Sequence, residues 1–284
     1  MKRLNENNCG DIMSLEELQK IQLKMLKTFA DFCIENDIRY YLSGGTLLGA
    51  IRHQGFIPWD DDVDVNVPRP DCIKLQELSC GHIGPYILQK PDVFSPYHAE
   101  SWRLYDPSVV IASSLGGTSK MPVYYAAFID IFPIEGLPSS KINIWLHYFK
   151  LVCIRKLMRC STVEYWSGKN FPAKIFHLVA GPFAKMVGYK NWYKWMQRIV
   201  AKYSFDDSEL IGVMTAPVHT TEEIIRKQDY LEPISVKFEG FDFCAPSNFD
   251  VYLTQLYGDY MKMPPKGKQV SHHSFKFYHY RESD

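Results

Sequence analysis

The part of this chain best suited to chemistry is a run of carboxylates set between apolar residues. The run reads Trp59-Asp-Asp-Asp-Val-Asp-Val-Asn-Val67, and its alternating valines predict a strand over residues 63–67. Because side chains alternate between the faces of a strand, valines in the core place Asp62 and Asp64 together on the opposite face. Carboxylates that close repel each other unless a cation compensates them. Their hard oxygens suit Mg²⁺, with Mn²⁺ as the alternative ion.

Two other interpretations of this run are a solvated acidic turn and a calcium-binding loop. Counting from Asp62, a loop of the helix-loop-helix type would need Gly where Val67 stands and Glu where Ile73 stands. The calcium loop is therefore a poor fit, and the acidic turn stays open as the alternative for this stretch alone.

A candidate phosphate site precedes the carboxylates in the segment Ser43-Gly44-Gly45-Thr46. Adjacent glycines let backbone N–H groups approach a phosphate, and the helix start predicted at Thr46 favours an anion. A Gly-Gly turn alone is more often structural. Its position about twenty residues before the carboxylate run makes it a candidate for binding substrate phosphates.

Asp130 is a further candidate, because it stands alone between Ile129 and Ile131 in a segment that predicts a buried strand. A carboxylate buried among apolar side chains needs a partner, which is a cation at a catalytic site or hydrogen-bond donors in a purely structural role. Both alternatives stay open for Asp130 from the sequence.

Basic side chains that would balance a phosphate are placed at several points of the chain. Arg52 follows Thr46 by six residues, and its planar fork suits a phosphate, although a surface role fits equally. Arg103 lies on an alternating segment, and Lys268, His272 and His273 in the C-terminal tail are candidates for a flap over the phosphates. Paired histidines without a further ligand at the right spacing are weak evidence for zinc.

Periodicity predicts the elements that position these residues. Ser14 and Glu17 form a capping box that opens an amphipathic helix, which continues to Phe32. Strands are predicted at 38–42, 63–67, 86–89, 102–105, 109–112, 123–131, 234–238 and 241–244, with helices at 46–51 and 248–257. This order predicts an α+β fold with a mixed sheet.

The region from 141 to 202 has a different pattern of long helical stretches, with interruptions predicted at Gly168 and Pro172 and again at Gly181-Pro182. We therefore predict three parts: a catalytic core over 1–140, a basic helical region over 141–220, and a C-terminal part over 221–284 that completes the core. The helical region is the insertion in this scheme.

This helical region carries a strong positive charge. From 141 to 202 there are twelve Lys or Arg and the single acid Glu164, a net charge of about +11, which leaves about −11 elsewhere. Aromatic residues are interleaved with these charges, so one hypothesis is a peripheral contact with an anionic membrane. The equal alternative is that the aromatics belong to a core and the lysines to a solvated face. Nucleic acid is disfavoured because no recognition motif accompanies the charge.

Composition sets the remaining limits. The 284 residues are 46% hydrophobic with 32 basic and 32 acidic residues, which predicts a globular protein without a general affinity for nucleic acid. Seven cysteines without a Cys-x-x-Cys pair predict buried free thiols rather than disulfides or a Cys-rich zinc site. A polar N-terminus and the lack of an apolar run of about 18 residues predict a cytoplasmic protein that contacts a membrane only from its inner face.

Ser43-Gly44-Gly45 followed by Asp62-Val63-Asp64 resembles the signature of the nucleotidyltransferase superfamily, the DNA polymerase beta-like fold. The longer stretch over residues 41–67 resembles one branch, the LicD family, which includes fukutin-related proteins. The resemblance continues at 128–136, 238–240, 256–265 and 271–273, whereas 141–220 offers little to match.

This resemblance implies a fold, a set of site residues and a reaction. Asp62 and Asp64 would be paired metal ligands, Asp130 the third carboxylate and the base, and Arg103 a basic position of the site. The donor would be CDP-linked, CDP-choline foremost, and the phospho-headgroup would pass to a hydroxyl of a glycan or glycolipid, as in lipopolysaccharide or teichoic acid, with release of CMP. The alternatives are nucleotidyl transfer to a small hydroxyl acceptor and a non-catalytic glycan- or nucleotide-binding role.

Overall fold

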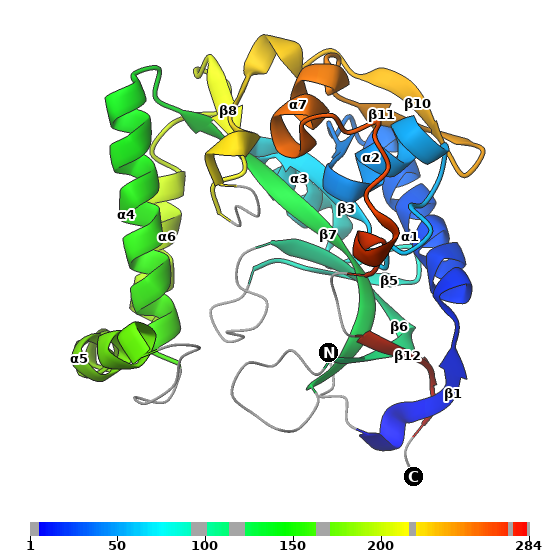
Figure 1. Ribbon diagram of the computed structural model, residues 1–284, viewed down its shortest axis with the longest axis horizontal. Helices are drawn as coiled ribbons and strands as arrows, with labels where there is room; N and C mark the ends of the chain where they lie inside the picture. The colour runs from blue at the N-terminus through cyan, green and yellow to red at the C-terminus, as the bar shows by residue number, and fades with distance from the viewer. Residues whose placement is uncertain are drawn as a thin grey trace. The chain divides into compact units, whose positions relative to one another are not determined.

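A computed structural model of the chain describes residues 6–91, 101–113, 123–162, 171–215, 220–271 and 275–282 (Figure 1). It has two compact units. Unit 1 comprises Met1–Lys90, Trp102–Phe132 and Gln228–Asp284, and unit 2 comprises Pro91–Ser101 and Pro133–Lys227. All the candidate site residues named above lie in the segments of unit 1, whereas the basic helices lie in unit 2.

Unit 1 is built on a sheet whose strands follow the order β1-β12-β6-β7-β3-β2. The β1–β12, β12–β6, β6–β7 and β2–β3 pairs are antiparallel. The strands are β1 (Cys9–Met13), β2 (Tyr41–Leu42), β3 (Asp64–Pro68), β4 (His82–Ile83), β5 (Tyr86–Gln89), β6 (Trp102–Ser113), β7 (Val123–Leu137) and β12 (Phe275–Tyr280). β5 extends the sheet from β6, and β4 pairs with β5. A separate hairpin joins β10 (Ile234–Phe238) and β11 (Phe241–Ala245).

The helices of unit 1 begin where the sequence provides caps or turns. They are α1 (Leu15–Glu35), α2 (Gly44–His53), α3 (Arg69–Ser79) and α7 (Phe249–Tyr257), with the 3-10 turns η1 (Glu6–Asn8) and η4 (Lys266–Lys268). At the start of α1, the backbone N–H of Glu17 donates to Ser14 Oγ at 3.2 Å, and Ser14 N–H donates to Glu17 Oε2 at 2.8 Å. The predicted capping box is confirmed. Leu18 of α1 is fully buried in a core with Tyr105 and Phe128 of the sheet.

Unit 2 is mainly helical. Its elements are α4 (Lys141–Cys160), α5 (Phe171–Val187), α6 (Tyr189–Val200), β8 (Leu210–Gly212), η2 (Thr220–Glu223) and β9 (Ile225–Arg226), and η3 (Lys227–Asp229) follows. In Figure 1, α4 and α6 run side by side and α5 lies at one end of this pair. Their shared core includes Leu151, Met158, Trp192 and Met196. The last residues of β7 pair with β8, which pairs with β9.

The α+β class predicted from the sequence is confirmed, with three differences in the elements. The strands predicted at 102–105 and 109–112 are one strand, β6, whose register shifts between Asp106 and Val110. The interruption predicted at Gly181-Pro182 is wrong, because α5 continues through both residues. β1, β4, β8, β9, β12 and α3 were not predicted. Gly168 lies outside the described residues.

The seven cysteines are free thiols, as predicted. Three are buried, namely Cys33, Cys72 and Cys160, whereas Cys80 is exposed and the others are half-buried. The expectation that all the cysteines are buried is therefore wrong, most clearly for Cys80, which ends α3 in the left-handed conformation.

Candidate active site

The predicted carboxylates lie on two neighbouring strands of unit 1. Asp64 opens β3, and Asp130 lies on β7, where its backbone N–H donates to the carbonyl of Val63 at 2.9 Å. Val63 and Val65 are fully buried, as the alternation of the sequence predicts. Asp62 and Asp130 both act electrostatically on the Asp64 carboxyl. The structure thus brings together the three carboxylates identified in the sequence.

Two further carboxylates, Asp60 and Asp61, belong to the same cluster. Carboxylate oxygens of Asp60, Asp61 and Asp62 all lie within 4.8 Å of one another. The loop is held to α1, because Gln19 Nε2 donates to the carbonyl of Asp60 at 2.9 Å and Gln22 Nε2 to that of Asp61 at 3.0 Å. The three consecutive aspartates are visible in the sequence, but of these only Asp62 was predicted to have a role.

Asp64 has the most perturbed electrostatic environment of the described carboxylates. Burial raises its pKa well above the usual range, and the neighbouring Asp62, Asp130 and Asp60 raise it further, whereas Arg103 lowers it. The folded chain therefore disfavours a negative charge on Asp64 in the absence of a bound cation.

Asp130 is paired with Arg103, which faces it across the strands: the two residues are register partners in the β6–β7 ladder. Arg103 Nε lies 2.7 Å from Asp130 Oδ1 and Nη2 lies 3.3 Å from Oδ2, a bidentate pair. The guanidinium also lies 3.9 Å from the ring centroid of Phe128. Although burial lowers the pKa of Arg103, Asp130 raises it above the usual range. Arg103 was predicted to bind substrate, and here it contacts a carboxylate of the site.

The two adjacent glycines are packed against the carboxylates. Gly44 begins α2 with φ of +51°, and a Cβ on it would lie 3.2 Å from Asp64 Oδ2. A Cβ on Gly45 would lie only 2.6 Å from Asp60 Oδ2. Any larger residue at Gly45 would have to displace that carboxylate, and Gly44 adopts a conformation that favours glycine. The start of α2, with its partial positive charge, is therefore adjacent to the acidic cluster.

Ser43 and Thr46 connect α2 to the first residue of β3. Asp64 N–H donates to Thr46 Oγ1 at 2.9 Å, and Ser43 N–H donates to the carbonyl of Asp64 at 3.1 Å. Both side chains are buried. These bonds position Asp64, and a direct contact of Ser43 or Thr46 with substrate stays a prediction.

Sequence reasoning missed two tyrosines of α7. Gly44 N–H donates to the hydroxyl of Tyr252 at 3.4 Å, and the hydroxyl of Tyr257 lies 3.8 Å from the position of a Cβ on Gly44. Burial raises the pKa of Tyr257, and Tyr252, Asp64, Asp60 and Asp62 raise it further. Tyr257 lies in the stretch 256–265 that resembles the family, although no role was assigned to it, whereas nothing in the sequence distinguished Tyr252 among 18 tyrosines.

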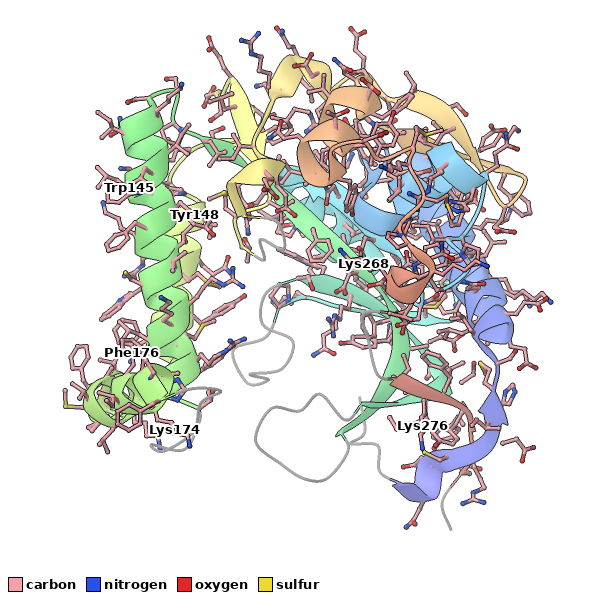
Figure 2. All side chains as sticks on the ribbon, in the orientation of Figure 1. Trp145, Tyr148, Lys174, Phe176, Lys268 and Lys276 are labelled. Atoms are coloured by element: carbon pink, nitrogen blue, oxygen red, sulfur yellow. The ribbon has the colours of Figure 1, made fainter. Side chains whose placement is uncertain are left out.

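The remaining basic candidates are distributed over unit 1. Arg52, in the last turn of α2, donates from Nη1 to the carbonyl of Tyr260 at 2.8 Å. Burial lowers the pKa of Arg52, whereas Tyr257 raises it, so Arg52 lies within electrostatic reach of a site tyrosine. Lys268 is exposed on η4 (Figure 2). His272 and His273 lie outside the described residues.

The chemistry of this donor set fits a divalent cation. Five aspartates supply hard carboxylate oxygens, namely Asp60, Asp61, Asp62, Asp64 and Asp130. Arg103 is the basic residue paired with one of them, Asp130. Burial and like charges that raise the pKa of Asp64 are the conditions that a bound cation relieves. A set of carboxylates next to a helix start is suited to holding Mg²⁺ against the phosphates of a ligand.

Comparison with known proteins first gives the class. A family model described as the nucleotidyltransferase domain of LicD, FKTN and FKRP matches residues 37–187. This range contains the carboxylate cluster, the glycine pair, Arg103 and Asp130. This match covers more than half of the chain and supports the nucleotidyltransferase class that the sequence resembles.

The chain belongs to the LicD family. The lipopolysaccharide cholinephosphotransferase LicD of Haemophilus influenzae is 30% identical to it over 274 residues, which cover 92% of this chain and 96% of the relative. The ribitol 5-phosphate transferase FKRP of Homo sapiens is 42% identical over 53 residues, covering 19% of this chain and 11% of that protein. An uncharacterised protein of Rickettsia prowazekii is 44% identical over 55 residues, 19% of this chain and 21% of its own length. The chain is a LicD-type phosphotransferase.

Proposed function

We propose that this enzyme is a Mg²⁺-dependent phosphotransferase that moves phosphocholine from CDP-choline onto a hydroxyl of a cell-surface glycan or its lipid-linked precursor, and releases CMP. Mn²⁺ is the alternative ion. The observation that carries the proposal is the cluster of aspartates packed against the start of α2, where Asp64 Oδ2 and Asp60 Oδ2 lie 3.2 and 2.6 Å from Cβ positions on Gly44 and Gly45. The raised pKa of Asp64, caused by burial and by the neighbouring Asp62, Asp130 and Asp60, is consistent with a site for a cation.

In this proposal Asp62, Asp64 and Asp130 hold the metal, and Asp60 is close enough to the cluster to contribute. Mg²⁺ bound there would neutralise charge on the donor diphosphate, which is the main requirement of phosphoryl transfer. The N–H groups at the start of α2 bind the anionic donor beside the carboxylates. Arg52 and Lys268 add positive charge from the end of α2 and from η4.

Asp130 is the base of the proposed reaction. Its carboxylate accepts the proton of the acceptor hydroxyl while the acceptor oxygen attacks the phosphorus that carries the headgroup. The bond between that phosphorus and the oxygen of CMP breaks, and CMP leaves with the bonding electrons. Arg103 holds both oxygens of Asp130, at 2.7 and 3.3 Å, and so orients the carboxylate. Arg103 acts in this scheme as a positioning residue.

The choice of headgroup follows the extent of similarity. The relative named as a cholinephosphotransferase of lipopolysaccharide matches nearly the whole chain, whereas the relatives named as ribitol 5-phosphate transferases match a segment of 53 residues. Phosphocholine and a lipopolysaccharide-like acceptor are therefore favoured over ribitol phosphate. The shared segment supports the common chemistry of transferring a phospho-headgroup to a glycan.

The test is CMP release by the purified enzyme with Mg²⁺, a glycolipid acceptor and a panel of CDP-choline, CDP-ethanolamine, CDP-ribitol and CDP-glycerol. We expect turnover with CDP-choline that requires both metal and acceptor. Asp64→Asn should abolish it, whereas Asp242→Asn, the same change at an exposed position of β11, should not.

Each alternative has a distinct result in this assay. Release of CMP from another donor would retain the reaction class and correct the headgroup. Release of pyrophosphate from a nucleoside triphosphate, with none of the CDP donors turned over, would replace the proposal by nucleotidyl transfer. If the Asp64→Asn variant turned over as fast as the Asp242→Asn variant, the proposed site would be wrong.

A further inference from the structure

Unit 2 presents an apolar helical face that its own core does not use. Along α4, Ile142, Trp145, Leu146 and Phe149 follow the three- and four-residue spacing of one helix face, and all four are exposed. Trp145 is 61% exposed, and its ring stacks on Phe149 with the centroids 5.4 Å apart.

The opposite side of α4 packs into the core of unit 2. Leu151 and Met158 are buried there, and Tyr148 packs against the same cluster. Figure 2 shows Trp145 on the side of α4 away from α6, and Tyr148 on the side toward α6. α4 therefore has two apolar faces, of which only one has a partner within unit 2. An exposed apolar patch of this kind usually marks a binding surface.

α5 extends the exposed apolar surface. Of its residues only Gly181 and Ala184 are buried, although the helix consists mostly of apolar residues. Val179 is 74% exposed and Met186 is 78% exposed. The exposed apolar residues of α4 and α5, called here the outer face, are Ile142, Trp145, Leu146, Phe149, Phe171, Ile175, Phe176, Leu178, Val179, Phe183 and Met186.

The charge of the three helices is the second, independent observation. α4, α5 and α6 contain ten Lys or Arg and no Asp or Glu in 49 residues. Lys141, Lys150, Lys156 and Lys185 are exposed on the two helices that carry the outer face. The surface is therefore apolar and cationic at the same time, without acidic residues on these helices.

We propose that the outer face of α4 and α5 binds the surface of a bilayer that contains anionic lipid. Exposed aromatic and aliphatic side chains enter the boundary between headgroups and acyl chains, while the flanking lysines contact the anionic headgroups. Among the described residues, no helix is long and apolar enough to cross a membrane, so the contact is peripheral.

The positive charge of α4 and α5 also favours an anionic bilayer over a second copy of the chain as the partner of the outer face. Two copies that met through this face would bring together two sets of helices that each carry seven basic residues and no acids, and juxtaposed like charges oppose association. A nucleic acid would match the charge but would leave the large aliphatic side chains of α5 without a partner. An anionic bilayer matches both properties. The proposal does not depend on which donor or acceptor the enzyme uses.

The experiment is sedimentation of the full chain with vesicles of phosphatidylcholine, with or without phosphatidylglycerol. We expect binding to the vesicles that contain phosphatidylglycerol, weakened when salt rises from about 0.1 M to about 1 M and shortens the Debye length from about 10 Å to about 3 Å. The combined change Trp145→Ser and Phe149→Ser should reduce binding by about tenfold or more. Ile73→Ser, at an exposed apolar position of α3 in unit 1, is the matched control and should bind as the wild type does.

The charge component has its own pair of variants. Lys150→Glu on α4 should weaken binding to the anionic vesicles, whereas Lys24→Glu, at an exposed position of α1, should not. Tryptophan emission of the wild type should shift to the blue on adding the vesicles, and Trp145→Phe should remove most of the shift. The shift itself is measured on the wild type, so its presence does not depend on any change to the surface of the helices.

Three results would overturn the proposal. The first is wild-type protein that stays in the supernatant with the anionic vesicles at low salt. The second is equal sedimentation of two proteins: the double variant Trp145→Ser with Phe149→Ser, and the control Ile73→Ser. The third is a wild-type dimer in light scattering that the Trp145→Ser and Phe149→Ser changes convert to a monomer, since a second copy would then occupy the outer face.

Discussion

At the scale of single residues, Arg103 and Asp130 form the structural link between the carboxylate cluster and the sheet. They are opposed on β6 and β7, and the bidentate pair is mostly shielded from solvent, with side chains 19% and 11% exposed. The guanidinium also lies over Phe128, so Asp130 and Phe128, both on β7, fix its position through two hydrogen bonds and a ring contact. Removing one member of such a pair leaves the other charge buried without compensation.

We predict that Arg103→Met lowers the free energy of unfolding by about 3–5 kcal/mol, because Asp130 loses its counter-charge. The double variant Arg103→Met, Asp130→Asn should recover a large part of this loss while remaining inactive. Urea unfolding of both single variants and the double variant measures the coupling. Strictly additive effects would show that the two residues do not interact as described.

Asp64→Asn should have opposite effects on stability and on activity. The raised pKa of Asp64 means that its charge destabilises the metal-free folded chain near neutral pH, so the neutral amide should raise the free energy of unfolding by about 1 kcal/mol or more. CMP release should fall by at least about 100-fold. Thermal unfolding without metal checks the first effect, and a destabilised variant would contradict it.

The sequence predicted part of this site and not the rest, for physical reasons. Asp62, Asp64 and Asp130 follow local alternation, which needs no knowledge of the fold. The partner of Arg103 depends on the register of β6 against β7, and the contact of Tyr257 with the cluster depends on where α7 packs, about 190 residues further along the chain. Such long-range pairings have no local signal.

At the scale of elements, the start of α2 packs closely against the loop that carries the aspartates. Gly45 has no room for a side chain, because a Cβ would lie 2.6 Å from Asp60 Oδ2. We predict that Gly45→Ala lowers CMP release by at least about tenfold, since a displacement of about 1 Å at a catalytic group has large effects on rate. The helix itself should tolerate alanine.

Gly267→Ala is the matched control for this prediction. Gly267 lies on η4, and no atom lies within 4 Å of a Cβ placed on it. The two variants therefore make the same chemical change with and without a steric conflict. Equal activity of both variants in the CMP assay would show that the contact between Gly45 and Asp60 does not control the site.

The missed strands β1 and β12 share one property: each is paired with a strand far away in the chain. β12 pairs with β6 and β1, which are more than 160 residues earlier, and its sequence alone suggested a basic tail.

α5 continues through Pro182, although proline usually interrupts a helix. The burial of Gly181 and Ala184 against the neighbouring helices supplies contacts that intrinsic propensity does not include.

At the scale of the whole molecule, the metal site proposed at the acidic cluster should couple metal binding to stability. We predict that Mg²⁺ raises Tm, by about 5–10 °C at a concentration of about 100 times Kd, where binding contributes about 2.7 kcal/mol. Chelation should reverse the rise. Differential scanning fluorimetry measures it, and the Asp64→Asn variant should show a much smaller effect.

This stabilisation should depend on pH. Since the folded pKa of Asp64 is raised, protonated Asp64 favours the metal-free folded state at low pH, and that contribution is lost as the pH rises through the folded pKa. Mg²⁺ competes with the proton, so the increase in Tm on adding Mg²⁺ should grow as the pH rises through the raised pKa of Asp64. An increase that is the same at every pH would contradict the role of Asp64.

The amino-acid composition of α4, α5 and α6 also determines which proteases can cut these helices. Trypsin, which cuts after Lys and Arg, has ten candidate bonds on α4, α5 and α6, whereas a glutamyl endopeptidase has none on these helices. The other 22 Lys or Arg lie elsewhere in the chain, so only tryptic fragments that end within α4, α5 or α6 report on these helices. Tryptic fragments report how accessible the helices are, and the glutamyl digest, which must cut elsewhere, serves as the internal reference. Any surface that covers α4 and α5 should slow tryptic cleavage within these two helices and leave the glutamyl digest unchanged.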